Sequence, residues 1–418
     1  MKIERQIYLN QLISAQGNGS IKIISGLRRC GKSYMLKTLF RSYLLDNGVD
    51  DSHIILIDLE NWRFKDFKSP DYLLDYVDSK MIDTEIYYIL IDEVQKVDEF
   101  VEVLATLLLK ENVEIYVTGS NSKFLSSDIA TDFRGRSDEI HMYPLSFSEF
   151  LSVYDGNEND ALLEYMNYGG LPQILLYKDD VAKAGFLRRI YRTVYLKDIY
   201  ERHNIEYLAE FEELIKVIAS SIGSLTNPNK LANSFKSKKN VKDITDKTIA
   251  SYLKYLSDAF LIESAEQYDI KGKNYIDSPM KYYFQDLGLR NSVLSFHQIE
   301  ETHLMENLIF NELKIRGFLV DVGVVPMRIR NAEGVQQRSS YEVDFVANKG
   351  SQRYYIQSAW RMPTEEKAEQ ETRSLRSIGD SFKKIIITGE NTLLKRDEYG
   401  ITTMNIIQFL KNPNSLDL

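Results

Sequence analysis

Short apolar runs alternate with helical spacing over the first 145 residues. The runs at residues 21–25, 87–91 and 113–117 are mostly apolar, as strands buried on both faces of a parallel sheet are. Residues 34–40 follow the first run and place their apolar side chains at helical spacing. This alternation predicts an α/β fold with a parallel sheet at the start of the chain.

The middle of the chain changes first to helical spacing and then to a helix–helix–hairpin pattern. Residues 146–210 are expected to form a helical connector, and residues 211–294 a winged helix. Two helices are expected in residues 211–294: the first starts with residues 231–235, and the second covers 246–256 and is capped by Thr245. Two strands follow, at 259–264 and 280–284, with a basic turn at 271–273 between them.

The last segment, residues 295–418, mixes helices and strands in a further α/β pattern. The expected elements are a helix at 303–313, strands near 318–325 and at 341–347, 353–360 and 384–388, and a Glu-rich helix at 364–377.

Composition and charge limit the function classes. The chain has 418 residues, enough for several domains, and 52 basic against 61 acidic residues give a net charge of −9. Such a chain has no overall attraction for nucleic acid or anionic membranes, so DNA contact requires a local basic surface. Cys30 is the single cysteine, which excludes an internal disulfide framework and a Cys-rich zinc module. No signal peptide or membrane span is visible, so we expect a cytoplasmic protein.

The loop after the first strand carries a phosphate-binding motif. Residues 26–33 have the sequence GLRRCGKS, which is G-x-x-x-x-G-K-S between a strand and a helix. Gly26 and Gly31 permit the bends that point backbone N–H groups at phosphate oxygens. Lys32 is expected to contact the β- and γ-phosphates of ATP, and Ser33 to offer a hydroxyl to Mg²⁺. The expected nucleotide-binding residues are Gly26, Leu27, Arg28, Arg29, Cys30, Gly31, Lys32, Ser33 and Tyr34.

Two carboxylates follow the second apolar run. Asp92 and Glu93 end the strand YYILI in the form of a Walker B segment, about 60 residues after the phosphate loop. Asp92 would hold Mg²⁺ through water, and Glu93 would polarise the attacking water as the catalytic residue.

A polar tip follows the third strand. A strand inserted between the two Walker strands would bring Gly119-Ser120-Asn121 beside the γ-phosphate of ATP. Asn121, or Ser120, would then act as a sensor that orients water. An ordinary Gly-Ser-Asn turn explains the same residues.

With these motifs in place, residues 1–200 resemble an AAA-type P-loop ATPase of the prokaryotic branch related to STAND-like signalling ATPases. The segments that carry the resemblance are IISGLRRCGKS, YYILIDEVQ, YVTGSNS, FRGR, YPLSFSEF and YGGLP. The resemblance implies that residues 146–210 form a helical lid. It also implies that Arg136, with Arg134 behind it, completes a nucleotide site, sometimes that of a neighbouring subunit. Pro172, in Gly170-Leu171-Pro172, would pack near the adenine. The alternatives are solvated arginines and a helix-terminating turn.

The C-terminal segment is similar to the PD-(D/E)xK restriction-endonuclease-like fold. In that fold a helix glutamate, a strand aspartate and an E-x-K motif gather a metal ion and activate water. Glu306 and Asp344 match the first two, and Gln357 stands at the glutamate position, but Ala359 replaces the lysine. Lys367 is a displaced alternative. The resemblance implies a degenerate nuclease site that serves DNA-shape or protein binding.

Basic residues gather on the expected winged helix. They are Lys236, Lys238, Lys239, Lys242, Lys247 and Lys254, and they give a local surface suited to duplex DNA. The alternative is an internal packing module that regulates nucleotide exchange. A second basic cluster in the connector, interleaved with tyrosines, fits either a nucleic-acid groove or one charged helix face. Its members are Arg188, Arg189, Arg192, Lys197 and Arg202.

The whole chain is similar to a prokaryotic ATPase family that joins an AAA-type core to a nuclease-like domain. We expect an AAA-type core at 1–145, a lid or connector at 146–210, a winged helix at 211–294 and a nuclease-like domain at 295–418. The expected function is a Mg²⁺-dependent ATP-hydrolysing conformational switch. Its expected ligand is ATP or ADP, and its expected partner is another protein or a further copy of the chain. The alternatives are an ATP-gated DNA-binding module and a metal-dependent nuclease.

Overall fold

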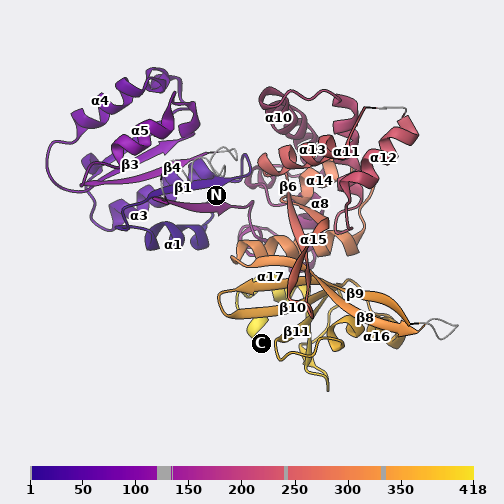
Figure 1. Cartoon of the computed structure of the whole chain (residues 1–418). Coiled ribbons are helices and arrows are strands. Elements are labelled where there is room, and N and C mark those ends of the chain that lie inside the picture. The colour runs from indigo at the N-terminus through magenta and orange to yellow at the C-terminus, as the bar shows by residue number, and fades with distance from the viewer. Residues whose placement is uncertain (1, 120–132, 134, 240–242, 331–335) are drawn as a thin grey trace. The chain divides into compact units, whose positions relative to one another are not determined.

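The computed structural model describes residues 2–119, 133, 135–239, 243–330 and 336–418 (Figure 1). The chain divides into two compact units. Unit 1 comprises Met1–Pro144 and Asp258–Phe260, and unit 2 comprises Leu145–Ser257 and Leu261–Leu418.

Unit 1 contains a five-stranded parallel sheet with the order β2-β3-β4-β1-β5. Its strands are β1 (Ile21–Gly26), β2 (Ile54–Asp58), β3 (Tyr87–Asp92), β4 (Val113–Thr118) and β5 (Ser137–Met142). The predicted α/β fold with a parallel sheet is confirmed. The inserted strand is confirmed too, because β4 lies between β3 and β1.

Helices cover both faces of this sheet. Figure 1 shows α4 and α5 on one side of the strands and α1 and α3 on the other. The helices are α1 (Gln6–Ser14), the continuous run of α2 (Lys32–Tyr34), the π-helical η1 (Met35–Phe40) and α3 (Arg41–Asp46), then α4 (Pro70–Lys80) and α5 (Phe100–Leu107). Leu73 and Val77 of α4 and Leu104 and Leu107 of α5 pack on the apolar strand residues in one buried cluster. The apolar runs are therefore the core of the sheet, as their composition predicts.

A buried ion pair explains the one charge in the middle of the first run. Lys22 of β1 is fully buried and forms an ion pair with Glu114 of the neighbouring strand β4. A buried ammonium is costly unless it is paired, so Glu114 is what allows a lysine inside this strand.

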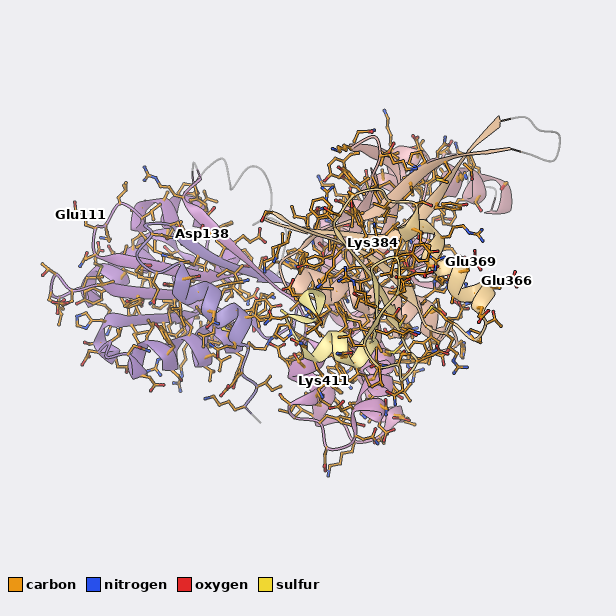
Figure 2. All side chains as sticks on the ribbon, turned by 90° about the horizontal axis from the view of Figure 1, so that it is seen from below. Glu111, Asp138, Glu366, Glu369, Lys384 and Lys411 are labelled. Atoms are coloured by element: carbon orange, nitrogen blue, oxygen red, sulfur yellow. The ribbon has the colours of Figure 1, made fainter. Side chains whose placement is uncertain are left out.

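Unit 2 contains the helices from α7 onward. They are α7 (Phe147–Leu151), α8 (Glu158–Tyr168), η6 (Pro172–Leu176), α9 (Asp180–Ile190), η7 (Tyr191–Leu196), α10 (Lys197–Arg202), α11 (Leu208–Ser220), α12 (Pro228–Lys239), α13 (Asp246–Asp258), α14 (Leu287–Val293), α15 (Glu301–Ile315), α16 (Glu365–Arg376) and α17 (Ile406–Lys411). The predicted Glu-rich helix is α16, whose Glu366 and Glu369 are exposed at the surface (Figure 2). Every residue of α14 is buried, so this short helix lies inside the unit.

An eight-stranded sheet runs through unit 2 with the order β12-β13-β11-β10-β9-β8-β6-β7. Its strands are β6 (Ile262–Asp269), β7 (Asn274–Phe284), β8 (Leu319–Arg330), β9 (Gln336–Lys349), β10 (Gln352–Ala359), β11 (Lys383–Thr388), β12 (Lys395–Arg396) and β13 (Ile401–Asn405). The β6–β7 hairpin, expected as the wing, joins the C-terminal strands because β6 pairs with β8 in parallel. Strands from both sides of the boundary expected between residues 294 and 295 therefore share one hydrogen-bonded sheet.

Three expected element starts in the middle of the chain were wrong: the strand expected from residue 280 begins at Asn274, and the other two have a local cause. The helix expected from residue 231 begins at Pro228, where proline suits the first helical turn and the Asn227 side chain accepts from the Asn229 N–H. The strand expected from residue 259 begins at Ile262, because Phe260 has a left-handed φ of 56° and turns the chain after α13.

Candidate nucleotide-binding site

The phosphate loop connects the end of β1 to the start of α2. Its backbone is left-handed at Gly26 (φ 134°), Arg29 (φ 65°) and Gly31 (φ 111°). Such turns direct successive N–H groups into one concavity that suits an anion. Gly26 also packs closely on β5, since a Cβ there would lie 2.1 Å from the carbonyl oxygen of Met142. The loop geometry therefore needs glycine at this position.

Lys32 lies inside the loop. Its Nζ donates to the carbonyl oxygens of Gly26, at 2.9 Å, and Leu27, at 3.0 Å, and the residue is buried. The ammonium is thus held at the centre of the loop by two neutral acceptors that a phosphate oxygen can replace.

Asp92 lies among hydroxyl groups at the carboxyl edge of the sheet. Its Oδ1 accepts from Ser33 Oγ at 2.9 Å and from Thr118 Oγ1 at 2.6 Å. The structure therefore brings together the two residues expected to hold magnesium, Ser33 and Asp92. A hydroxyl and a carboxylate side by side are the oxygen donors that Mg²⁺ prefers, so the residues present fit this ion.

Sequence reasoning missed Lys37 and Asp58 at this edge. Lys37 Nζ lies 2.9 Å from both Asp58 Oδ2 and Asp92 Oδ2. Burial alone would lower the pKa of Lys37, but the two carboxylates raise it above its usual value. Asp58 pairs in register with Asp92 on the neighbouring strand. Asp58 could have been found from the sequence, because it ends an apolar run in Ile-Asp just as Asp92 does. No sequence pattern pointed to Lys37.

Glu93 occupies a constrained position next to Asp92. Its backbone is left-handed, with φ 59°, and its N–H donates to Thr118 Oγ1 at 2.9 Å. Its carboxylate accepts from the Gln95 amide, and the residue is buried. Thr118, which sequence reasoning also missed, therefore contacts both Walker B acids. An unusual backbone angle held by such bonds is typical of functional sites.

Arg5, from the segment before α1, ties the phosphate loop to the end of β5. Its guanidinium donates to the carbonyls of Cys30 at 2.9 Å, Tyr143 at 2.7 Å and Pro144 at 3.2 Å, and it lies over the Tyr8 ring at 4.8 Å. Cys30 is buried. Its backbone and side chain thus belong to the packing of the loop.

Four of the remaining expected residues contribute no described contact to this site. Asn121, Ser120 and Arg134 lie outside the described residues, so the sensor role stays a prediction. Arg136 is exposed before β5, where its carbonyl accepts from the Ile21 N–H at 3.0 Å. Of the other loop residues, Arg29 is exposed and Arg28 and Tyr34 are half-buried.

Pro172 belongs to unit 2 and begins η6. The preceding turn is held by the buried Asp286, whose Oδ2 accepts from the Gly170 N–H at 2.8 Å. Burial raises the pKa of Asp286 to about 6, although backbone N–H groups at its carboxylate oppose the shift. The adenine contact of Pro172 stays a prediction.

The residues of the expected nuclease site gather around a lysine that sequence reasoning missed. Lys281 Nζ lies 3.0 Å from Glu306 Oε1, 2.7 Å from Glu342 Oε1 and 3.8 Å from Asp344 Oδ1. Burial and the Glu306 carboxylate raise the pKa of Asp344 to about 8, an effect that Lys281 opposes. Burial alone would lower the pKa of Lys281, but the three carboxylates raise it above its usual value.

Gln357 and Lys367 are engaged elsewhere. The Gln357 side chain accepts from the Asp344 N–H at 3.4 Å and donates to Glu371 at 3.4 Å. Lys367 forms an ion pair with the same Glu371 at 2.5 Å, and Ala359 is buried. Within the described ranges, no group of three or more His, Cys, Asp or Glu side chains is arranged to hold a metal ion.

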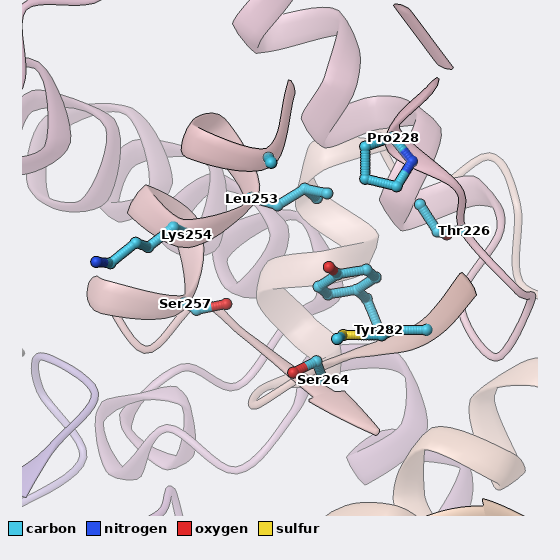
Figure 3. A pocket seen from close by; sticks show the side chains of 9 residues that line it. Thr226, Pro228, Leu253, Lys254, Ser257, Ser264 and Tyr282 are labelled. Carbon is cyan, nitrogen blue, oxygen red and sulfur yellow. The ribbon is translucent and has the colours of Figure 1, made fainter. Parts of the chain in front are cut away.

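Helix α13 presents a basic stripe. Lys247 and Lys254 are both exposed, and a separation of seven residues places them on one face of the helix. Between α12, α13 and the β6–β7 hairpin lies a pocket of about 360 Å³, lined by residues that include Pro228, Leu253, Lys254 and Tyr282 (Figure 3). Lys242 lies outside the described residues, as do the side chains of Lys238 and Lys239.

The basic residues of the connector are partly neutralised by their neighbours. Arg202 forms an ion pair with Asp198 at 2.5 Å, and Lys197 with Glu201 at 3.6 Å. The guanidinium of Arg189 donates to the Tyr177 hydroxyl at 3.3 Å. These local pairs favour the charged helix face over a nucleic-acid groove.

Comparison with known proteins agrees with this geometry. A family model described as an AAA domain matches residues 18–151, and one described as a domain of unknown function matches residues 159–300. The chain is 34% identical over 394 residues to an uncharacterized protein of Haemophilus influenzae, covering 93% of this chain and 94% of that one. It is 31% identical over 338 residues to an uncharacterized protein of Methanocaldococcus jannaschii, covering 78% and 71%.

A solved structure shares the fold. The Walker-type ATPase of Pyrococcus abyssi is 15% identical, with a TM-score of 0.50 over 70% of this chain and 96% of that chain. At this identity the likeness concerns the fold alone. No helix in the described ranges is long and apolar enough to cross a membrane.

Proposed function

Because the chain belongs to the same family as these Haemophilus and Methanocaldococcus relatives and carries an AAA domain at residues 18–151, we propose that it binds and hydrolyses ATP with Mg²⁺ and acts as a conformational switch. Its first unit has the fold of AAA-type P-loop ATPases. The observation that carries the proposal is the network at Asp92, where Ser33, Lys37 and Thr118 converge on one carboxylate at the mouth of the phosphate loop.

Each residue of the network has a task that its contacts suit. Lys32 gives up its bonds to Gly26 and Leu27 and pairs with the β- and γ-phosphates of ATP. Ser33 and Asp92 hold Mg²⁺, which when bound neutralises charge that develops on the phosphate oxygens. Glu93 orients the attacking water and accepts its proton, and Thr118 keeps the Glu93 backbone in place.

Lys37 balances charge before the ion arrives. Asp58 and Asp92 are register partners on the neighbouring strands β2 and β3, and two adjacent carboxylates with no cation between them repel each other. The Lys37 ammonium lies between them and compensates their negative charge. The network is therefore assembled before nucleotide binds, as electrostatic catalysis requires.

Steady-state ATP hydrolysis with Mg²⁺ tests the proposal, with Lys32→Ala as the control that loses phosphate contact. Glu93→Gln is expected to retain ATP binding while hydrolysis falls by at least a hundredfold, since only the proton acceptor is removed. Loss of binding together with hydrolysis in Glu93→Gln would contradict the role given to this residue. Turnover that is the same in Lys32→Ala would refute the proposal as a whole.

A switch also needs a link to the rest of the chain. Arg5 bonds both the phosphate loop, at Cys30, and Pro144, the residue at which the chain leaves unit 1. A change in the loop on nucleotide binding would therefore reach this connection directly. In this scheme Asn121 senses the γ-phosphate of ATP, Pro172 packs near the adenine, and Arg136 acts within a homo-oligomer. Measurement of the molecular mass of the protein in solution, with and without ATP, tests whether the oligomer that Arg136 requires is formed.

The exposed lysines of α13 favour a second candidate function, ATP-gated binding of duplex DNA. Among the described residues neither Lys247 nor Lys254 forms an ion pair, so both ammonium groups are available to phosphates. Duplex affinity is expected to weaken steeply with salt and to fall in Lys247→Ala/Lys254→Ala, while Lys395→Ala, an exposed lysine of β12, leaves it unchanged. Affinity that ignores salt, or that the double variant retains, would exclude this candidate.

A further inference from the structure

One buried lysine in unit 2 lies among carboxylates from two other elements. Lys281 belongs to β7, Glu306 to α15, and Glu342 and Asp344 to β9. The side chain of Lys281 is 3% exposed, and those of Glu306 and Asp344 are each 11% exposed. A charged group so far from water is retained only where its partners compensate for the lost hydration.

The two buried carboxylates of the cluster, those of Glu306 and Asp344, have partners within the protein. Glu306 Oε1 accepts from the Tyr283 hydroxyl at 2.9 Å as well as from Lys281. Asp344 Oδ2 accepts from the Ser358 N–H at 2.8 Å, while Asp344 Oδ1 faces the ammonium. Glu306 and Asp344 are therefore already oriented, the first by a hydroxyl and the second by a backbone donor.

These contacts do not fit the divalent metal that a PD-(D/E)xK resemblance implies. Mg²⁺ needs oxygen donors at about 2.1 Å in an octahedral arrangement. The Lys281 ammonium lies 3.0 Å from Glu306 Oε1 and 3.8 Å from Asp344 Oδ1, so it occupies the space beside the two acids that the resemblance assigns to the metal. Both oxygens of Asp344 are already engaged, Oδ2 by the Ser358 N–H and Oδ1 by the ammonium that it faces.

We propose that Lys281 is the resident cation of this cluster: its ammonium stands where a nuclease of this fold would hold a metal ion, and it fastens the β6–β7 hairpin to α15 and β9. The site then has no metal to activate water, which excludes hydrolysis of phosphodiesters at this point. The same ion pairs join the hairpin that follows α13 to the C-terminal strands, in addition to the β6–β8 pairing. The hairpin and the nuclease-like strands are thereby held as one rigid element.

The first test uses the Lys281→Met variant of the full-length, nucleotide-free chain. The control variant is Lys395→Met, which removes an exposed lysine from the same unit. Breaking a buried pair leaves uncompensated carboxylates, so the unfolding midpoint of Lys281→Met is expected to fall by roughly 10 °C. Millimolar Mn²⁺, the probe cation, is expected to restore at least half of that fall and to leave the wild type and Lys395→Met unchanged. An equal fall with and without Mn²⁺ would overturn the proposal.

Mn²⁺ binding to the wild type gives an independent test that survives if Lys281→Met does not fold. Electron paramagnetic resonance is expected to show no Mn²⁺ binding that depends on Asp344, so wild type and Asp344→Asn bind the same amount. Lys281→Arg, which keeps the positive charge, is expected to behave as the wild type. Mn²⁺ bound by the wild type and lost in Asp344→Asn would overturn the proposal, as would plasmid nicking by the wild type that Asp344→Asn abolishes.

Discussion

Removal of the Arg5 side chain is the sharpest perturbation of the phosphate loop that leaves every loop residue in place. Arg5 is 2% exposed and donates to three carbonyl oxygens, those of Cys30, Tyr143 and Pro144, while stacking on Tyr8. In Arg5→Ala these carbonyls lose a charged donor and a cavity opens between the loop and the end of β5.

The magnitude follows from the contacts. A hydrogen bond to a charged group contributes about 1.5–3 kcal/mol, and a desolvated cation–π contact adds up to about 2 kcal/mol. The full sum is not lost, because water entering the cavity satisfies part of the carbonyls and the desolvation of the guanidinium is recovered. We therefore expect Arg5→Ala to destabilise unit 1 by about 3 kcal/mol, which is roughly a hundredfold in the opening equilibrium.

Hydrogen exchange measured by mass spectrometry is the appropriate assay, because it reports the opening of β1, the phosphate loop and β5 separately from unit 2. Protection of these peptides is expected to fall by about a hundredfold in Arg5→Ala and less in Arg5→Lys, which keeps one charge but not the forked donor. Arg41→Ala is the control, since its partner Asp51 is exposed and such surface pairs contribute about 0.5 kcal/mol. Protection within about threefold of the wild type in Arg5→Ala would refute the reasoning.

Three further predictions concern other described groups. Thr118→Val removes the donor to Asp92 and should lower ATP hydrolysis at least tenfold with little change in ATP binding; unchanged turnover would contradict it. Lys37→Met leaves Asp58 and Asp92 without their shared cation, so the midpoint temperature of thermal unfolding of unit 1 should fall by roughly 5 °C. Mg·ADP should restore this midpoint, and a midpoint that does not fall in the variant would count against the charge-balance role. Asp286 has a raised pKa of about 6, so the native state binds its proton more tightly than the unfolded state does, and its stability contribution falls by about 2 kcal/mol as pH rises from 4 to 6.5. The stability difference between wild type and Asp286→Asn, measured by denaturant unfolding across that range, should show this slope, and a flat difference would disprove the shift.

Local patterns in the sequence were sufficient for the ATPase core. The phosphate loop could be predicted because the strand, loop and helix that build it are contiguous, so residues 21–40 carry the whole signal. Asp92 and Glu93 could be predicted because each ends an apolar run, and carboxyl ends of parallel strands meet at one edge. A strand inserted between the two Walker strands was also expected, and β4 occupies that position.

The contacts that define each site depended on neighbours distant in the chain. Asp58 reaches Asp92 only because β2 and β3 pair in that register, and Lys37 reaches both from the π-helical turn η1. Lys281 meets Glu306 and Asp344 because the β6–β7 hairpin joins the C-terminal sheet, a pairing that sequence spacing did not indicate. The E-x-K spacing points only to position 359 and its surroundings, so it gives no indication of a lysine from β7.

The sequence by itself determined the phosphate loop, the Walker B acids and the α/β class of the core, because each depends on side-chain types within one strand, loop or helix. Tertiary structure alone decided which charges meet: Lys37 with Asp58 and Asp92, Arg5 with the loop carbonyls, and Lys281 with its carboxylates. The physical reason is that hydrophobic periodicity specifies which face of an element is buried, whereas the partner of a buried charge is set by strand order and register between elements far apart in the chain.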